Sequence, residues 1–151
     1  MYTGKRKITV NGKNLKIAII LPYFNENIGL ELAKNAADEL QQNKVQKKNI
    51  QLFRVAGALE IPFACQKIIK KNKFDAIIAL AIVIRGETSH YELVTETTYH
   101  GLMQVQLNSN IPIIFGILAC ENLAQVKERI SKNGQNKGQE FARAALIQTL
   151  I

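Results

Sequence analysis

Residues 74–84 read Phe-Asp-Ala-Ile-Ile-Ala-Leu-Ala-Ile-Val-Ile, and residues 85–90 continue as Arg-Gly-Glu-Thr-Ser-His. From Ala76 to Ile84 the chain is apolar without polar alternation, which is typical of a strand that is covered on both faces of a parallel sheet. In open sheets of this kind, ligands bind beyond the carboxyl ends of the strands, where helix amino termini point free N–H groups outward. The stretch therefore predicts an α/β fold with a binding site at residues 85–90.

The residue types at 85–90 suit a phosphorylated small molecule. Gly86 allows the backbone to approach a ligand closely, and Thr88 and Ser89 can cap the following helix or donate to an anion. His90 supplies an imidazole, the side chain that exchanges protons near neutral pH. The alternative is an ordinary helix cap followed by a surface histidine.

Apolar runs elsewhere in the chain predict three further strands, at residues 15–21, 50–55 and 111–118. Helices are expected over residues 89–107 and after residues 133–138. Apolar residues at helical spacing predict three others. The first carries Ile28, Leu32, Ala36 and Leu40, the second holds Phe63, Ile68 and Ile69, and the third is a short amphipathic helix with Leu123, Val126 and Ile130 inward. This order predicts a three-layer α/β/α sandwich around a four-stranded parallel sheet.

The chain has 151 residues, which is enough for one well-filled core and too few for two ordinary domains. We expect a single domain over residues 15–151, after a basic N-terminal arm at residues 1–14 that is flexible or adds a strand to another subunit. Cys65 and Cys120 lack metal-ligand spacing, which predicts no metal site and a reducing, cytoplasmic location. No apolar stretch reaches the roughly 18 to 20 residues that cross a bilayer, so no membrane partner is expected.

The formal net charge of +8 is concentrated at the amino-terminal end. Residues 1–73 carry a net charge of +9, and residues 74–151 carry −1. No aromatic residues interleave with these lysines, and no zinc, helix-turn-helix or RNA-binding motif accompanies them. Solvated lysine-rich faces therefore explain the charge better than the alternative, a nucleic-acid-binding domain.

Three predicted exit loops should meet at one edge of the sheet: Phe24-Asn25, residues 57–60 and residues 85–90. Phe24 offers a flat apolar face for a planar ring, although a loop phenylalanine also serves at a core margin. Glu60 can accept hydrogen bonds from a polyol or act as a helix-dipole partner. Arg129 and Lys137 are candidate ligands for phosphate or polyol groups, with surface solvation as the alternative.

Six short motifs together resemble the 6,7-dimethyl-8-ribityllumazine synthase family. In chain order they are Ala58–Pro62, Val83–His90, Gly101–Met103, Phe115–Leu118, Gln125 with Arg129, and Asn136–Gly138. The resemblance extends from Leu15 to the end of the chain. It implies a flavodoxin-like fold, assembly into pentamers or into shells of twelve pentamers, and active sites between neighbouring subunits.

The resemblance also implies the reaction. In it, 5-amino-6-(D-ribitylamino)uracil condenses with 3,4-dihydroxy-2-butanone 4-phosphate to 6,7-dimethyl-8-ribityllumazine, with release of phosphate and water, and without a cofactor or metal. Riboflavin synthase is a candidate partner. The short segment between Arg129 and Lys137 resembles that of shell-forming members and favours a 60-subunit assembly.

The same resemblance assigns roles to individual residues. His90 would transfer protons. Apart from the resemblance, Glu92 lies two residues after His90 and would orient it where the helix start brings the two together. Arg129, from the same or a neighbouring subunit, would join the phosphate pocket formed by Gly86, Glu87 and Thr88. The pyrimidine and its ribityl chain would contact Phe24, Asn25, Ala58, Leu59, Glu60, Ile82, Val83 and Ile84, with Phe115 and Lys137 contributed across the interface.

A few positions depart from the family's pattern. Ala56 stands where proline is usual, Ala81 where glycine is usual, and Ala119-Cys120 where hydroxyl residues are usual. None of them is an expected proton carrier, so we expect activity to be retained. The alternative is a catalytically weakened, cage-forming scaffold of the same fold. A flavodoxin-type flavin binder fits poorly, because residues 22–25 lack the hydroxyl-rich loop that such proteins use for phosphate.

Overall fold

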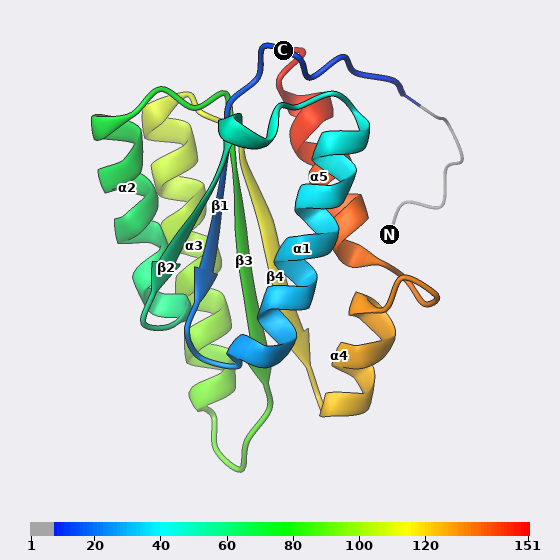
Figure 1. The fold of residues 1–151 in the computed structure, drawn as a ribbon. Coiled ribbons are helices and arrows are strands. Elements are labelled where there is room, and N and C mark those ends of the chain that lie inside the picture. Colours follow the sequence, from blue (N-terminus) through cyan, green and yellow to red (C-terminus); the bar gives the residue numbers. More distant parts are fainter. Residues whose placement is uncertain (1–7) are drawn as a thin grey trace.

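Four parallel strands form one sheet at the centre of the computed structural model, which describes residues 8–151 (Figure 1). They are β1 (Ile17–Pro22), β2 (Ile50–Val55), β3 (Ala76–Ile84) and β4 (Ile113–Cys120). Their order in the sheet is β2-β1-β3-β4, and every neighbouring pair is parallel. The predicted sheet is confirmed. The connections change direction between β1 and β3, which is where ligands bind in open sheets of this kind.

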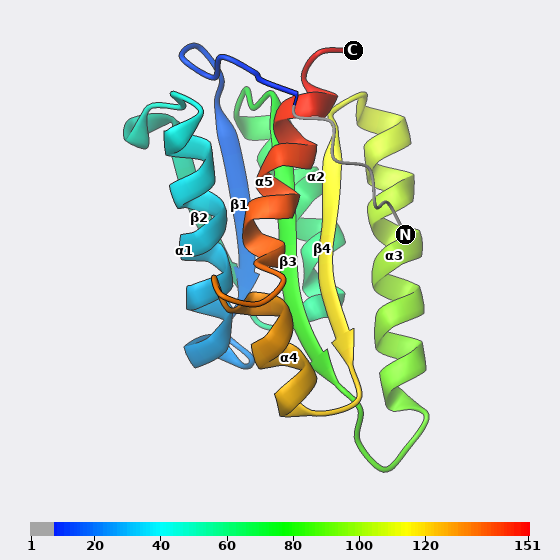
Figure 2. The ribbon, with the colours of Figure 1, turned by 90° about the vertical axis from the view of Figure 1, so that its right-hand side faces the viewer.

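Helices cover both faces of the sheet (Figures 1 and 2). One face carries α1 (Glu26–Gln42), α4 (Leu123–Ile130) and α5 (Lys137–Gln148). The other carries α2 (Ile61–Lys71) and α3 (His90–Ser109). Two short 3-10 helices, η1 (Lys47–Asn49) and η2 (Ala58–Glu60), precede β2 and α2. The three-layer α/β/α architecture expected from the sequence is therefore confirmed.

β3 is buried on both faces because successive side chains of a strand point to opposite sides of the sheet. Ile78 and Leu80 lie in the core beneath α1 and α5, whereas Ile77 and Ala79 lie in the core beneath α2 and α3. All four side chains are fully buried. This two-sided burial explains the absence of polar alternation in the strand.

The predicted strand boundaries are close to the observed ones. The second strand matches exactly, while β1, β3 and β4 each begin two residues later than predicted. Phe74 shows why, because its ring packs edge-on against Phe53 with the centroids 5.8 Å apart and lies before the first ladder pair of β3. Its apolar character therefore reflects packing outside the strand.

The prediction for Leu123 is wrong, because its side chain is 42% exposed instead of facing inward. Leu123 opens α4, whereas Val126 and Ile130, further along the helix, belong to the core. A helix of eight residues buries a narrow stripe here, and its first residue lies outside that stripe.

The part of the predicted N-terminal arm that the structure describes packs against its own chain. Residues 8–14 contain no strand, and Val10 is buried in the core beneath α1. The Gly12 N–H donates to the Asn43 carbonyl oxygen at 2.7 Å. Residues 1–7 of the arm lie outside the described residues. None of the helices within residues 8–151 combines the length and the apolar character needed to cross a bilayer.

A buried carboxylate joins α1 to α5. The Glu39 carboxylate, 6% exposed, accepts hydrogen bonds from Arg143 Nε at 2.8 Å and from Gln139 Nε2 at 3.0 Å. Burial acts to raise the pKa of Glu39, but the hydrogen bonds from Arg143 and Gln139 outweigh it, so the pKa lies below its ordinary value. Ionised Glu39 therefore stabilises the folded chain.

We predict that Glu39→Gln lowers the free energy of unfolding at pH 7 by about 1–2 kcal/mol, because a charged hydrogen-bonded pair is lost. Because the folded chain depresses the pKa of Glu39, this stabilisation is present above the ordinary value of 4.5 and is lost as the pH falls through the folded value. Urea unfolding at pH 7, 5 and 3 measures the difference between the two proteins. Glu31→Gln, at an exposed position of the same helix, is the control, and a difference that stays constant down to pH 3 would contradict the prediction.

Candidate active site

A pocket of about 430 Å³ opens at the carboxyl edge of the sheet, at the ends of β1 and β3. Its wall is formed by residues from three segments, at 22–25 after β1, at 57–59 after β2, and between 81 and 94, from the end of β3 into α3. The predicted meeting of the three exit loops is thus confirmed. The volume lies within the range of small-molecule sites, roughly 300–1,000 Å³.

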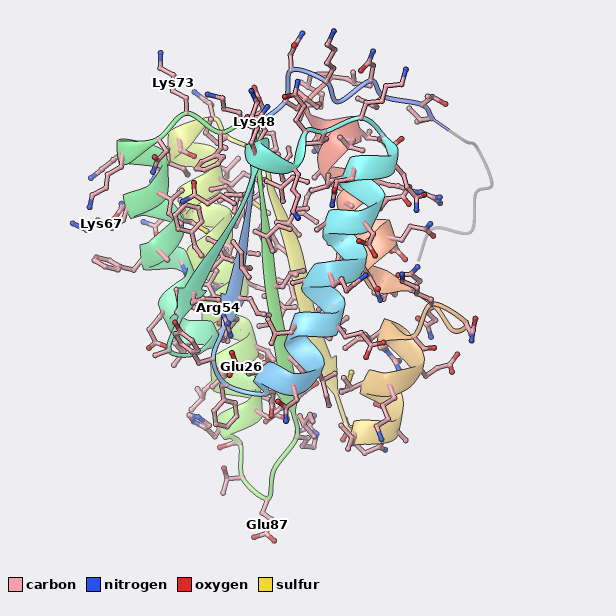
Figure 3. The ribbon with its side chains drawn as sticks, viewed as in Figure 1. Glu26, Lys48, Arg54, Lys67, Lys73 and Glu87 are labelled. Carbon is pink, nitrogen blue, oxygen red and sulfur yellow. The ribbon has the colours of Figure 1, made fainter. Side chains whose placement is uncertain are left out.

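Most of the residues predicted for the site line this pocket. They are Phe24, Asn25, Ala58, Leu59, Ile82, Val83, Ile84, Gly86, Thr88 and His90. Glu60 lies at the rim, with a carboxylate oxygen 3.0 Å from the position that a Cβ at Gly57 would occupy. Glu87 lies at the tip of the loop and points away from the body of the protein (Figure 3).

The other three predicted residues lie elsewhere on this chain. Phe115, on the edge strand β4, pairs with Ala79 of β3, and the centroids of its ring and the Tyr99 ring are 5.7 Å apart. Arg129, on α4, donates to the Gln125 carbonyl oxygen at 3.0 Å. Lys137 begins α5, where its Nζ contacts Glu140 at 2.8 Å. None of the three lines the pocket formed by their own chain.

The loop after β1 is held between β2 and β3. The Tyr23 N–H donates to the Val55 carbonyl oxygen at 2.8 Å, and Asn25 Nδ2 donates to the Ile82 carbonyl oxygen at 3.0 Å. Asn25 has a φ of 60°, in the left-handed region that asparagine tolerates better than most residues. Phe24, between these two anchors, is 73% exposed and its ring borders the pocket.

Arg85 ties the loop after β3 to the loop after β4. Its Nε donates to the Glu121 carboxylate at 2.9 Å, its Nη1 donates to Glu92, and its guanidinium lies 4.1 Å from the centroid of the Tyr91 ring. The hydrogen bond from Arg85 lowers the pKa of Glu92. The carboxylate of Glu92 is thus engaged by Arg85, and the expected contact with His90 is not formed in the described part of the chain.

The start of α3 brings His90 to the pocket. The His90 N–H donates to Thr88 Oγ1 at 3.3 Å, while Ser89, at the N-cap position, makes no side-chain cap. Tyr91 and Val94 also line the pocket and were not predicted from the sequence. Val94 follows His90 by four residues, which places both on one side of a helix. This spacing could have predicted that Val94 faces the pocket together with His90.

The described residues that line the pocket include neither lysine nor arginine. Residues 8–151 also contain no group of three or more His, Cys, Asp or Glu side chains that could hold a metal ion. Cys65 and Cys120 are free and buried, and burial raises the pKa of Cys65 to about 12. Within the described chain, the polar groups that face the pocket are therefore the backbone, Thr88, His90 and Tyr91, beside the loop-bound amide of Asn25.

Comparison with known proteins gives a match over nearly the whole chain. The sequence pattern of the 6,7-dimethyl-8-ribityllumazine synthase family matches residues 14–150. The chain belongs to this family. A similar relative is the 6,7-dimethyl-8-ribityllumazine synthase of Pediococcus pentosaceus (strain ATCC 25745 / CCUG 21536 / LMG 10740 / 183-1w), which is 44% identical over 138 residues, covering 91% of this chain and 88% of the relative. The matched range includes every loop that forms the pocket.

Two positions that depart from the pattern of the lumazine synthase family lie near the pocket. Ala81 forms part of its wall and is 1% exposed, so its methyl group is packed within the sheet. Ala56 is exposed, one residue before Gly57. Neither side chain carries a polar group, so neither alters the set of proton-transferring residues at the site.

We predict that Gly86→Ala leaves the fold intact and weakens binding of an anion. A Cβ at Gly86 would meet nothing within 4 Å, and its φ is outside the left-handed region, so packing does not require glycine there. The added methyl group would occupy the space through which an anion approaches the backbone, and we expect about 5- to 10-fold weaker binding of inorganic phosphate. Calorimetric titration and thermal unfolding measure the two effects.

Gly12→Ala is the matched control for this prediction. A Cβ at Gly12 would lie 2.9 Å from the Asn43 carbonyl oxygen, and Gly12 does not line the pocket, so this variant should lose stability and keep its affinity for phosphate. Unchanged phosphate binding by a stable Gly86→Ala protein would show that the anion does not approach the backbone at this residue.

Proposed function

We propose that this chain catalyses the condensation of 5-amino-6-(D-ribitylamino)uracil with 3,4-dihydroxy-2-butanone 4-phosphate to 6,7-dimethyl-8-ribityllumazine. The observation that carries the proposal is the composition of the pocket, in which an apolar slot faces a glycine-threonine-histidine turn at the start of a 20-residue helix. The slot suits a flat heterocycle, and the turn suits a phosphate. Membership of the family supports this pairing of substrates.

The pyrimidine would lie in the apolar part of the pocket. Phe24 would stack on the ring, as an exposed aromatic side chain at a pocket wall can do. The strand end Ile82–Ile84 would bound the opposite side, while Ala58, Leu59 and Glu60 would hydrogen-bond the ring and its ribityl chain. Asn25 would act here mainly through its bond to Ile82, which fixes the loop.

The phosphate of the second substrate would lie against Gly86, Glu87 and Thr88. Backbone N–H groups in this turn, the hydroxyl group of Thr88 and the positive end of the α3 dipole favour an anion there. Glu87 would contribute its backbone, because its side chain points away (Figure 3). The last residue of this turn, Thr88, precedes His90 by two positions, so the phosphate would lie near the imidazole of His90.

His90 would carry the protons that the reaction moves. The 5-amino group adds to the substrate carbonyl and water leaves, which gives an imine. A proton is then removed from the hydroxyl-bearing carbon as inorganic phosphate departs from the adjacent carbon, which leaves an enol. The enol tautomerises to a ketone, and the ribitylamino nitrogen attacks that ketone and closes the ring with loss of a second water. Each step needs a proton given or taken near neutral pH, which an imidazole can do in turn.

We propose further that neighbouring copies complete the site in a homo-oligomer, as pentamers and as a 60-subunit shell. Lysine and arginine form strong hydrogen bonds to phosphate, yet the described wall of the pocket holds neither. Arg129, Lys137 and Phe115 lie outside the pocket of their own chain and would be supplied by a neighbour. The outer sides of α2 and α3 expose a set of large apolar side chains that would lie at such an interface: Phe63, Leu93, Met103 and Leu107.

We propose that residues 15–151 form one domain and that the enzyme works in the cytoplasm, which agrees with two free cysteines. Riboflavin synthase, which consumes the product, is the proposed partner.

We predict that His90→Ala slows turnover by about 10- to 100-fold without abolishing it, because holding two substrates together supplies most of the rate. Lumazine absorbance, followed from the two purified substrates, measures kcat. A wild-type protein without turnover would favour the scaffold alternative. Complete loss of turnover in an assembled His90→Ala protein would contradict the assigned role.

We predict that two inactive variants restore activity when they share an oligomer. Gly86→Asp repels phosphate from the turn, and Arg129→Ala removes the proposed cation. If the turn and the arginine come from different chains, equal mixing leaves roughly a quarter of the sites with both groups intact. Co-refolding the two variants and assaying the mixture tests this, and activity no higher than that of the separate variants would place Arg129 in the same chain as the turn.

A further inference from the structure

Arg54, on the edge strand β2, makes four contacts with the segment that carries Phe24. Its Nε donates to the Leu21 carbonyl oxygen at 3.1 Å, and its Nη2 donates to the Pro22 carbonyl oxygen at 3.3 Å. Its Nη1 lies 2.9 Å from Glu26 Oε1. Its guanidinium also lies 4.3 Å from the centroid of the Tyr23 ring.

These contacts hold the loop from one side. They reach the last two residues of β1, the first residue of the loop, and the first residue of α1, so that Phe24 lies between contacted positions. Figure 3 shows the side chains of Arg54 and Glu26 at the same end of the sheet. On the other side, Asn25 holds the loop to Ile82 at 3.0 Å. Phe24 itself is 73% exposed, so its own packing does little to fix its position.

A surface ion pair alone would not explain this arrangement. Glu26 is 43% exposed, and an exposed pair of this kind contributes little to stability. The side chain of Arg54 is only 19% exposed, and its planar fork donates to two consecutive carbonyl oxygens while its face rests near an aromatic ring. Lysine cannot reproduce this combination, because its ammonium group is a point charge without a planar face.

We infer that Arg54 is a positioning residue for Phe24, and through Phe24 for the flat heterocyclic substrate. The inference rests on the proposed function. Arg54 does not line the pocket, so it would act by fixing the backbone that presents the aromatic ring. The turn at Gly86–His90 belongs to a different segment, between β3 and α3, and none of the contacts of Arg54 reaches it.

Because the two segments are held separately, substitutions of Arg54 should change the KM of one substrate much more than the KM of the other. In Arg54→Met we expect the KM for the ribitylaminouracil substrate to rise by about 10-fold, because small displacements of a positioned group carry large kinetic costs. We expect the KM for the butanone phosphate to change by less than about 2-fold, because its turn is anchored separately. Arg54→Lys should show most of the same defect.

Phe24→Leu distinguishes a positioning role of Arg54 from a purely structural role. If Arg54 acts through Phe24, Arg54→Met has little further effect on the KM for the heterocycle once the aromatic ring is absent, because the two substitutions affect one interaction. Arg143→Met is the matched control. It removes an arginine that contacts Glu39 between α5 and α1, away from the pocket, so it should lower stability and leave both KM values unchanged.

Steady-state kinetics with each substrate varied in turn measure these values. Equal changes in the two KM values, no change in either, or a full 10-fold effect in the Phe24→Leu background would each overturn the inference. If Arg54→Met fails to fold, Glu26→Gln and Arg54→Lys remove only part of the contacts, and the same split is required of them. A wild-type protein without turnover contradicts the proposed function, whereas an active wild type with unaffected variants contradicts only the role of Arg54.

Discussion

The position of β3, which is buried on both faces and lies between β1 and β4, fixes where the loops of the pocket lie. Because Ala76–Ile84 must lie in the interior of the sheet, its carboxyl end emerges beside that of β1, where the connections of the sheet change direction. The loop to α3 and the loop to α1 thereby line one opening, together with the segment after β2. The pocket follows from strand order, and the residue types in the three segments decide what it binds.

Two arginines stabilise these loops from outside the pocket, and neither lines it. Arg85 is held by two carboxylates and an aromatic ring, and Arg54 contacts two carbonyl oxygens, a carboxylate and an aromatic ring. In both cases the positive charge is used within the chain. The wall that this chain contributes to the pocket is left mostly apolar, apart from the α3 turn and a few polar groups, which suits a flat ring.

The sequence was sufficient to predict the architecture and most of the pocket because those features depend on local patterns. Apolar runs located the strands within two residues, and the loops after them followed from strand direction. The structural role of Arg85 could not be predicted, since its partner Glu121 lies 36 residues away. Arg54 was missed for the same reason, because its carbonyl partners lie 32 and 33 residues earlier in the chain. The inward orientation expected for Leu123 failed because periodicity does not show where a short helix leaves the core.

The absence of lysine and arginine from the described pocket wall has a consequence for how the enzyme behaves at different concentrations. If the anion-binding charge belongs to an adjacent copy, a freshly synthesised chain is catalytically incomplete until it has found its neighbours. Specific activity would then fall on dilution, without any inhibitor, once subunits begin to separate. The reaction would therefore require a protein concentration high enough to keep the subunits assembled.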